Sequence, residues 1–120
     1  MTETTKLQKL TNELISYVEV SLERYQVAKE KQEQPDFYHE VKPFADKVKL
    51  INDEWQELAK SWLQNARQKH IFTQQIDSAH DQLETISIQC FYPQTSKRNF
   101  LNLARSVQFV LDNVLNALRC

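Results

Sequence analysis

Two Asp-x-x-His pairs are the features of the sequence closest to a known metal-binding motif. Asp36 stands three residues before His39, and Asp77 stands three residues before His80. In di-iron four-helix bundles, a Glu-x-x-His pair on each of two helices and a further glutamate on each of the others all point inward. Here Asp36 is placed to cap a helix, and Asp77 and His80 flank an apolar stripe instead of lying on it. We therefore predict that the chain holds no metal and no cofactor.

The sequence also contains no motif that supports nucleophilic or acid–base catalysis. The chain has three histidines, and no Gly-x-Ser-x-Gly elbow pairs a nucleophile with an oriented base. Helical ribonucleases of the HEPN type place an arginine somewhat further upstream of a histidine than Arg67 stands from His70. We expect His70 to be a solvated connector residue, and we expect no catalytic residues in this chain.

The composition favours a helical fold. The 120 residues include no glycine, which tight hairpins and sharp loops need, and only three prolines, at positions 35, 43 and 93. The formal net charge of −1 creates no overall attraction to nucleic acid or to an anionic membrane, so we expect neither as a partner.

Targeting signals and cysteines indicate the compartment. No run of roughly eighteen apolar residues and no secretory leader pattern occurs in the sequence. Two cysteines, Cys90 and Cys120, make neither a disulfide framework nor a zinc site, and Cys90 falls on an apolar stripe. We expect a cytoplasmic protein.

Apolar residues recur every three or four positions in four separate stretches, which is the rhythm of amphipathic α-helices. We predict helices at about residues 5–31, 37–69 with a kink or short pre-helix near Pro43, 74–91 and 96–118. Thr4 or Thr5, Asp36 and Thr73 are candidate caps for the first three helices. Short connections force each helix to reverse against its predecessor. The sequence thus predicts one all-α domain, residues 1–120, that folds as an antiparallel up-and-down four-helix bundle.

The inward positions of these helices predict the core. They are Leu7, Leu10, Leu14, Val18, Ser21 and Tyr25; Phe44, Val48, Ile51, Trp55, Leu58, Trp62 and Ala66; Ile76, Ala79, Leu83, Ile86 and Cys90; and Phe100, Leu103, Val107, Leu111, Val114 and Leu118. Aromatic rings at the centre of such stripes are expected to fill the core and not to line a ligand cavity. An enzyme, or a bundle that binds a small ligand or metal in its interior, is the alternative interpretation.

Charge is distributed unevenly between the last two helices. Residues 71–92 carry three acidic and no basic residues, whereas residues 93–120 carry four basic residues and one acidic residue. The two segments therefore have net charges of −3 and +3, and we expect attraction between the third and fourth helices. Each exposed ion pair is worth only about 0 to 1 kcal/mol.

One apolar residue of the fourth helix departs from the bundle pattern. At 100 degrees per residue, Phe109 points about 160 degrees away from the buried direction marked by Val107. It then lies on an outer strip with Arg98, Asn102, Arg105, Asp112 and Asn116. Interfaces are enriched in aromatic residues and arginine, so we interpret this strip as a face that binds another protein or a second copy in a weak homodimer. A single scattered hydrophobe, which most proteins expose, is the alternative.

Three runs of the sequence are distinctive: residues 36–43 (DFYHEVKP), the helix with Trp55 and Trp62, and residues 97–100 (KRNF) leading to Ser106 and Val107. These runs resemble the YppE-like family of small uncharacterised proteins from Bacillus and its relatives. The similarity extends over most of residues 36–116. It implies an all-α bundle in a Gram-positive bacterial cytosol, and it carries no functional residue over to this chain.

Overall fold

The computed structural model describes residues 2–66 and 68–119, and within them it contains four α-helices and one short π-helical segment. In chain order these are α1 (Thr2–Lys31), η1 (Phe37–Val41), α2 (Lys42–Asn65), α3 (Thr73–Gln89) and α4 (Lys97–Arg119). The two described segments contain no strand, which confirms the all-α prediction. None of their helices combines the length and apolarity needed to cross a bilayer.

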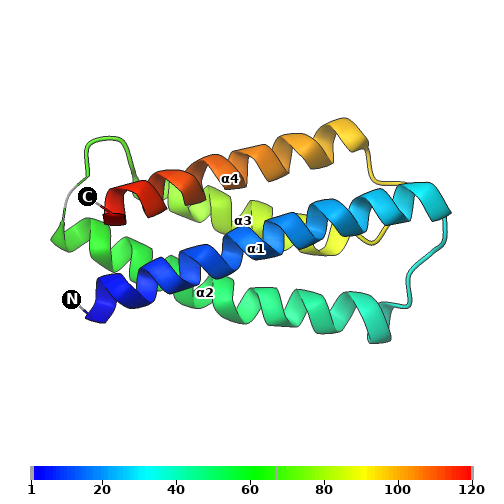
Figure 1. Ribbon diagram of the computed structural model, residues 1–120, viewed down its shortest axis with the longest axis horizontal. Coiled ribbons are helices and arrows are strands. Elements are labelled where there is room, and N and C mark those ends of the chain that lie inside the picture. The colour runs from blue at the N-terminus through cyan, green and yellow to red at the C-terminus, as the bar shows by residue number, and fades with distance from the viewer. Residues whose placement is uncertain (1, 67, 120) are drawn as a thin grey trace.

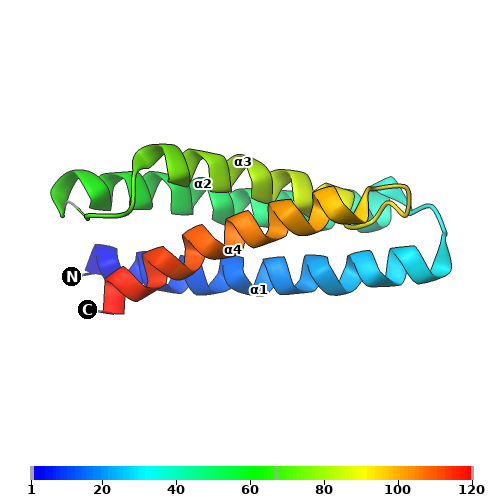
Figure 2. The ribbon, with the colours of Figure 1, turned by 90° about the horizontal axis from the view of Figure 1, so that it is seen from above.

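Successive helices run in opposite directions and close into a bundle (Figure 1). α1 packs against α2 and α4, and α3 packs against the same two helices. Seen from above, α1 and α4 form one layer, and α2 and α3 form the other (Figure 2). The start of α1 and the end of α4 lie at the same end of the molecule, which measures 46 × 26 × 20 Å. The predicted antiparallel up-and-down bundle is confirmed.

The predicted stripes of α1 and α3 are buried throughout, and the stripe of α4 is buried except for its half-buried Leu103 and Leu118. The seam of α2 differs from the prediction. Its centre runs through Val48, Asn52, Trp55, Ala59 and Trp62. The larger apolar residues that the sequence favoured at the seam, Phe44, Ile51 and Leu58, are half-buried at its edges. The fully buried Asn52 is accommodated because its amide donates a hydrogen bond of 2.8 Å to the carbonyl of His80.

The turn before α2 explains how Pro43 is tolerated. An Asp36 carboxylate oxygen accepts a hydrogen bond of 3.1 Å from the backbone N–H of His39, which confirms Asp36 as a cap. The residues after it form η1, and α2 begins only at Lys42. Pro43 thus occupies the first turn of α2, where a backbone donor is not needed. The expected kink or pre-helix is the π-helical segment.

Three helix ends differ from the prediction. α2 ends at Asn65 and not near Lys69, and Ala66 is exposed beyond it. α1 already includes Thr4 and Thr5, so neither precedes it as a cap. Thr73 is the first residue of α3 and not its cap; instead, the Gln75 side chain accepts a hydrogen bond of 2.8 Å from the N–H of Phe72. The connector between α2 and α3 is therefore longer than the sequence predicts.

Candidate functional site

All six residues of the strip predicted on α4, hereafter the α4 strip, are exposed to solvent. They are Arg98, Asn102, Arg105, Phe109, Asp112 and Asn116. The phenyl ring of Phe109 is the large apolar side chain among them, and this residue is 62% exposed. Phe109 therefore lies on the solvent-facing side of α4, as its angle from Val107 predicts.

Phe109 also lies beside residues of the α2–α3 connector. Together with Asn113 and Ala117 of α4 it borders a hollow of about 420 Å³, whose other wall is residues 68–71 of the α2–α3 connector. His70 belongs to this wall and is exposed, as predicted. The sequence did not indicate this arrangement, because it depends on where α2 ends and on how the connector crosses towards α4.

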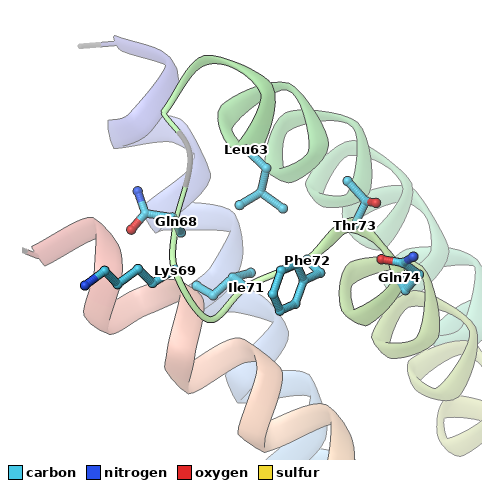
Figure 3. Close-up of a pocket in the computed structure, with 7 residues that line it drawn as sticks. All are labelled: Leu63, Gln68, Lys69, Ile71, Phe72, Thr73 and Gln74. Atoms are coloured by element: carbon cyan, nitrogen blue, oxygen red, sulfur yellow. The ribbon is translucent and has the colours of Figure 1, made fainter.

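A second hollow, of about 600 Å³, also borders the connector and shares Gln68, Lys69 and Ile71 with the first. Figure 3 shows Leu63 extending from α2 towards Ile71 and the ring of Phe72. Ile71 is buried, whereas Phe72 is 56% exposed. In the same view Lys69 points to the side opposite Phe72. We call the surface formed by the half-buried Gln68 and the exposed Lys69, Phe72 and Phe109 the connector surface.

The connector surface has an excess of positive charge. In sequence, residues 61–76 contain two basic residues and no acidic one. Among the residues that the structure describes, Lys69, Arg98 and Arg105 form no ion pair. The charges of Lys69 and Arg105 are therefore available to a ligand that approaches the connector surface, whereas Arg98 lies in the first turn of α4, at the opposite end of the bundle.

The expected attraction between α3 and α4 is not formed as ion pairs within the described ranges. Two of the three acidic side chains of α3 pair with α2 instead: Asp77 lies 3.0 Å from the Lys60 ammonium, and Glu84 lies 3.6 Å from that of Lys49. The charge count along the sequence was correct, but it could not show which neighbour each side chain faces. This pairing leaves the basic residues of α4 without partners on α3.

A polar cluster between α2 and α3 was missed by the sequence interpretation. His80 is only 9% exposed, and its Nε2 lies 2.7 Å from an Asp53 carboxylate oxygen on α2. The same Nε2 lies 3.4 Å from Glu84, one turn further along α3, and Nδ1 lies 3.2 Å from Asp81. Lys49 adds an ammonium group 3.1 Å from Asp53. The available signal was the i, i+4 spacing of His80 and Glu84.

The two Asp-x-x-His pairs do not combine into one site. Asp36 and His39 form a local, exposed pair at 2.8 Å. Asp77 binds the side chains of Lys60 and Gln56 and so is occupied away from His80. His80 is the exception to the expectation that these residues stay outside the interior, because it is buried between α2 and α3 against Asp53.

His80 and Asp53 have pKa values shifted in opposite directions. Burial lowers the pKa of the imidazole, but hydrogen bonds to Asp53 and Asp81, helped by the charges of Glu84 and Asp53, outweigh burial and raise it above its ordinary 6.5. The hydrogen bond to His80, with that to Lys49, holds the pKa of Asp53 below its ordinary 3.8 despite partial burial. The folded state therefore favours an imidazolium–carboxylate pair.

This pair predicts how stability depends on pH. Because the pKa of His80 is higher in the folded than in the unfolded chain, protonation of His80 stabilises the fold. This stabilisation is complete below pH 6.5, the pKa of the unfolded chain, and is lost as the pH rises through the folded pKa. The pKa of Asp53 is lower in the folded than in the unfolded chain, so its ionised form also stabilises the fold. This stabilisation is complete above pH 3.8, the ordinary aspartate pKa, and is lost as the pH falls through the folded pKa. Denaturant unfolding should thus show the largest destabilisation by His80→Gln between pH 3.8 and 6.5. His70→Gln is the control, and a pH-independent effect of His80→Gln would contradict the assignment.

Comparison with known proteins places this fold in a family. A model described as a bacterial domain of unknown function (DUF1798) matches residues 11–118. The chain belongs to this family. It is 25% identical over 108 residues to the uncharacterized protein YppE of Bacillus subtilis. The aligned region covers 90% of this chain and 88% of that protein. The YppE-like resemblance seen in the sequence is confirmed.

Two solved structures of similar proteins share the bundle. A crystal structure of a Listeria innocua protein of unknown function has a TM-score of 0.93 at 26% identity, covering 98% of this chain and 94% of that one. The crystal structure of a DUF1798 domain from Staphylococcus aureus has a TM-score of 0.86 at 24% identity, covering 93% and 95%. These proteins support the fold and assign no activity to the surfaces described above.

Proposed function

We propose that this protein is a cytosolic protein-binding module whose contact surface is the connector surface. The observation that carries the proposal is the pair of exposed phenyl rings, Phe72 at 56% and Phe109 at 62%, each bordering a hollow beside the same connector. Exposed aromatic residues next to concave surfaces are typical of the residues that dominate binding energy in interfaces. Each hollow offers space for an apolar side chain of a partner.

The basic residues near the two rings indicate the charge of the partner segment. Lys69 and Arg105 have no ion-pair partner among the described residues and lie on the connector and on the α4 strip. A partner segment with apolar anchors flanked by carboxylates would satisfy both the rings and these charges. A symmetric dimer through this surface would double its basic charge at the contact, with Asp112 as the acidic residue of the α4 strip. We therefore favour an acidic amphipathic segment of another protein over self-association.

The chemistry of the remaining candidate groups supports a binding role over a catalytic one. Burial raises the pKa of the Cys90 thiol to about 12, so this cysteine is not an activated nucleophile. A free, buried thiol also suits a reducing cytosol. Trp55 and Phe100 are fully buried and Trp62 nearly so, which supports a filled interior over one that lines a ligand cavity.

The test removes both rings and measures binding and stability together. In affinity capture from a bacterial host lysate, Phe72→Ser with Phe109→Ser should lose a specific partner that the wild type retains. The stability of the double variant should stay within about 0.5 kcal/mol per substitution, because both sites are exposed. The captured protein should bind through an acidic segment, and its binding should weaken as salt is added.

Leu50→Ser is the matched control, because Leu50 is a 72% exposed apolar residue on α2 outside the connector surface. It should retain the partner. Retention of the same proteins by the double variant would overturn the proposal. A partner that binds through a basic segment would contradict the charge argument.

A further inference from the structure

The polar cluster between α2 and α3 brings together three groups that ligate metals. One donor atom each from Asp53, His80 and Glu84 lies within 4.8 Å of the other two. In tetrahedral coordination, metal–ligand bonds of about 2.0–2.2 Å place neighbouring donors roughly 3.3–3.6 Å apart. The distance from His80 Nε2 to Glu84 Oε1 is already 3.4 Å. The distance from Nε2 to the Asp53 carboxylate is 2.7 Å, and it needs to increase only a little once the proton between these two atoms is lost.

Glu84 supplies an independent observation that points to a cation. Its Oε1 atom is shielded from solvent and accepts no hydrogen bond from the residues described. It nevertheless faces two positive or protonated groups, with His80 Nε2 at 3.4 Å and the Lys49 ammonium at 3.6 Å. These ion pairs balance its charge but leave it without a hydrogen bond, and a divalent cation would give it a direct ligand bond in place of the contact to Lys49.

The surroundings orient His80 for coordination through Nε2. Asp81 lies 3.2 Å from Nδ1, which is the carboxylate–histidine arrangement found behind metal-bound imidazoles. The buried amide of Asn52 donates to the His80 carbonyl at 2.8 Å and holds this turn of α3 against α2. The donors therefore come from two helices whose relative position is constrained beside the site.

The charge of the cluster matches a divalent ion. With a neutral imidazole, the carboxylates of Asp53, Asp81 and Glu84 face a single ammonium, that of Lys49. Lys49 is 60% exposed and can turn outward into water. We propose that Asp53, His80 and Glu84 bind one divalent first-row transition metal ion, Zn²⁺ being the reference ion, with water completing its coordination. One imidazole nitrogen and two carboxylate oxygens suit such an ion better than the all-oxygen shells of Mg²⁺ or Ca²⁺.

This site differs from the sequence-based expectation of no metal because the ligands do not follow the Asp-x-x-His pairs. Only His80 belongs to such a pair, and its partners in the cluster are Glu84 on the next turn and Asp53 on the neighbouring helix. The proposal is independent of the connector surface, since none of its ligands contributes to that surface.

Calorimetric titration of the untagged, metal-free full chain with Zn²⁺ tests the site. The wild type should bind one ion per chain, and Glu84→Gln and His80→Gln should each weaken binding by at least about tenfold. Glu84→Gln keeps the proposal testable if His80→Gln folds poorly, because the Glu84 side chain is 36% exposed and its shielded oxygen accepts no hydrogen bond from the described residues. His39→Gln is the matched control, because His39 forms an exposed pair with Asp36 alone.

Two further measurements separate this site from adventitious binding. At a concentration that just saturates the wild type, Co²⁺ should give visible absorption bands that are weaker in Glu84→Gln, and Zn²⁺ should raise the unfolding temperature of the wild type more than that of Glu84→Gln. Absence of saturable binding to the wild type would overturn the proposal. Unchanged Zn²⁺ affinity in both cluster variants would also overturn it, because the ion would then be held by other residues.

Discussion

Trp55→Ala is expected to lower the free energy of unfolding by about 3–5 kcal/mol. Trp55 is fully buried on the seam of α2, and its indole N–H donates a hydrogen bond of 3.1 Å to the Thr11 hydroxyl on α1. Thr11 in turn donates to the Leu7 carbonyl at 2.7 Å. The substitution therefore leaves a large cavity and removes the polar link between α1 and α2. Denaturant titration followed by circular dichroism measures the loss.

Domains of this size are usually stable by only about 5–15 kcal/mol, so the Trp55→Ala chain is expected near the limit of folding. Leu50→Ala provides the control on the same helix, because Leu50 is 72% exposed and its truncation should change stability by no more than about 0.5 kcal/mol. A loss below roughly 1 kcal/mol for Trp55→Ala would show that α1 and α2 do not enclose this ring.

The helices and most of the core were predictable because apolar side chains leave water only along one face of a helix. Leu7, Leu14 and Val18 on α1, and Ile76 and Leu83 on α3, follow this spacing and are all buried. Without glycine to supply turns, the chain must also end α1 with an ordinary residue, and Gln32 adopts a positive φ of 54° there.

What the sequence missed depends on residues whose burial is not signalled by hydrophobicity. Ile51 and Leu58 were assigned to the seam of α2 because they are apolar, yet its centre passes through Asn52 and Ala59. Asn52 is buried because its amide finds the His80 carbonyl, and that partner is set by the packing of two helices. Sequence periodicity contains no information about such a partner.

The candidate sites were predictable to different degrees for the same reason. The exposure of Phe109 follows from its angle on one helix, so the sequence was sufficient. The hollow beside Phe109 needs the path of the connector, and the His80 cluster needs the register of α2 against α3. Side chains that meet across helices, such as Asp53 and His80, require the three-dimensional structure.

The contact between α1 and α4 predicts a second large effect: Phe100→Ala is expected to cost about 3–5 kcal/mol of unfolding free energy. Phe100 is fully buried and its ring stacks on Tyr25, with centroids 4.2 Å apart and planes 23° from parallel. The Tyr25 hydroxyl donates to the Thr95 carbonyl at 2.6 Å, just before α4. Truncation therefore removes the ring that anchors the first turn of α4 to α1, and equilibrium denaturation measures the loss.

Tyr25→Phe isolates the polar part of this contact. It keeps the stacked ring and removes only the hydroxyl, so the expected loss is about 1 kcal/mol. If Phe100→Ala costs no more than Tyr25→Phe, the stacked pair does not anchor α4, and the closure of the bundle between α1 and α4 must rest on residues further along the helix. If the losses differ as expected, apolar burial joins these two helices, and the Tyr25 hydrogen bond fixes the position of the loop that precedes α4.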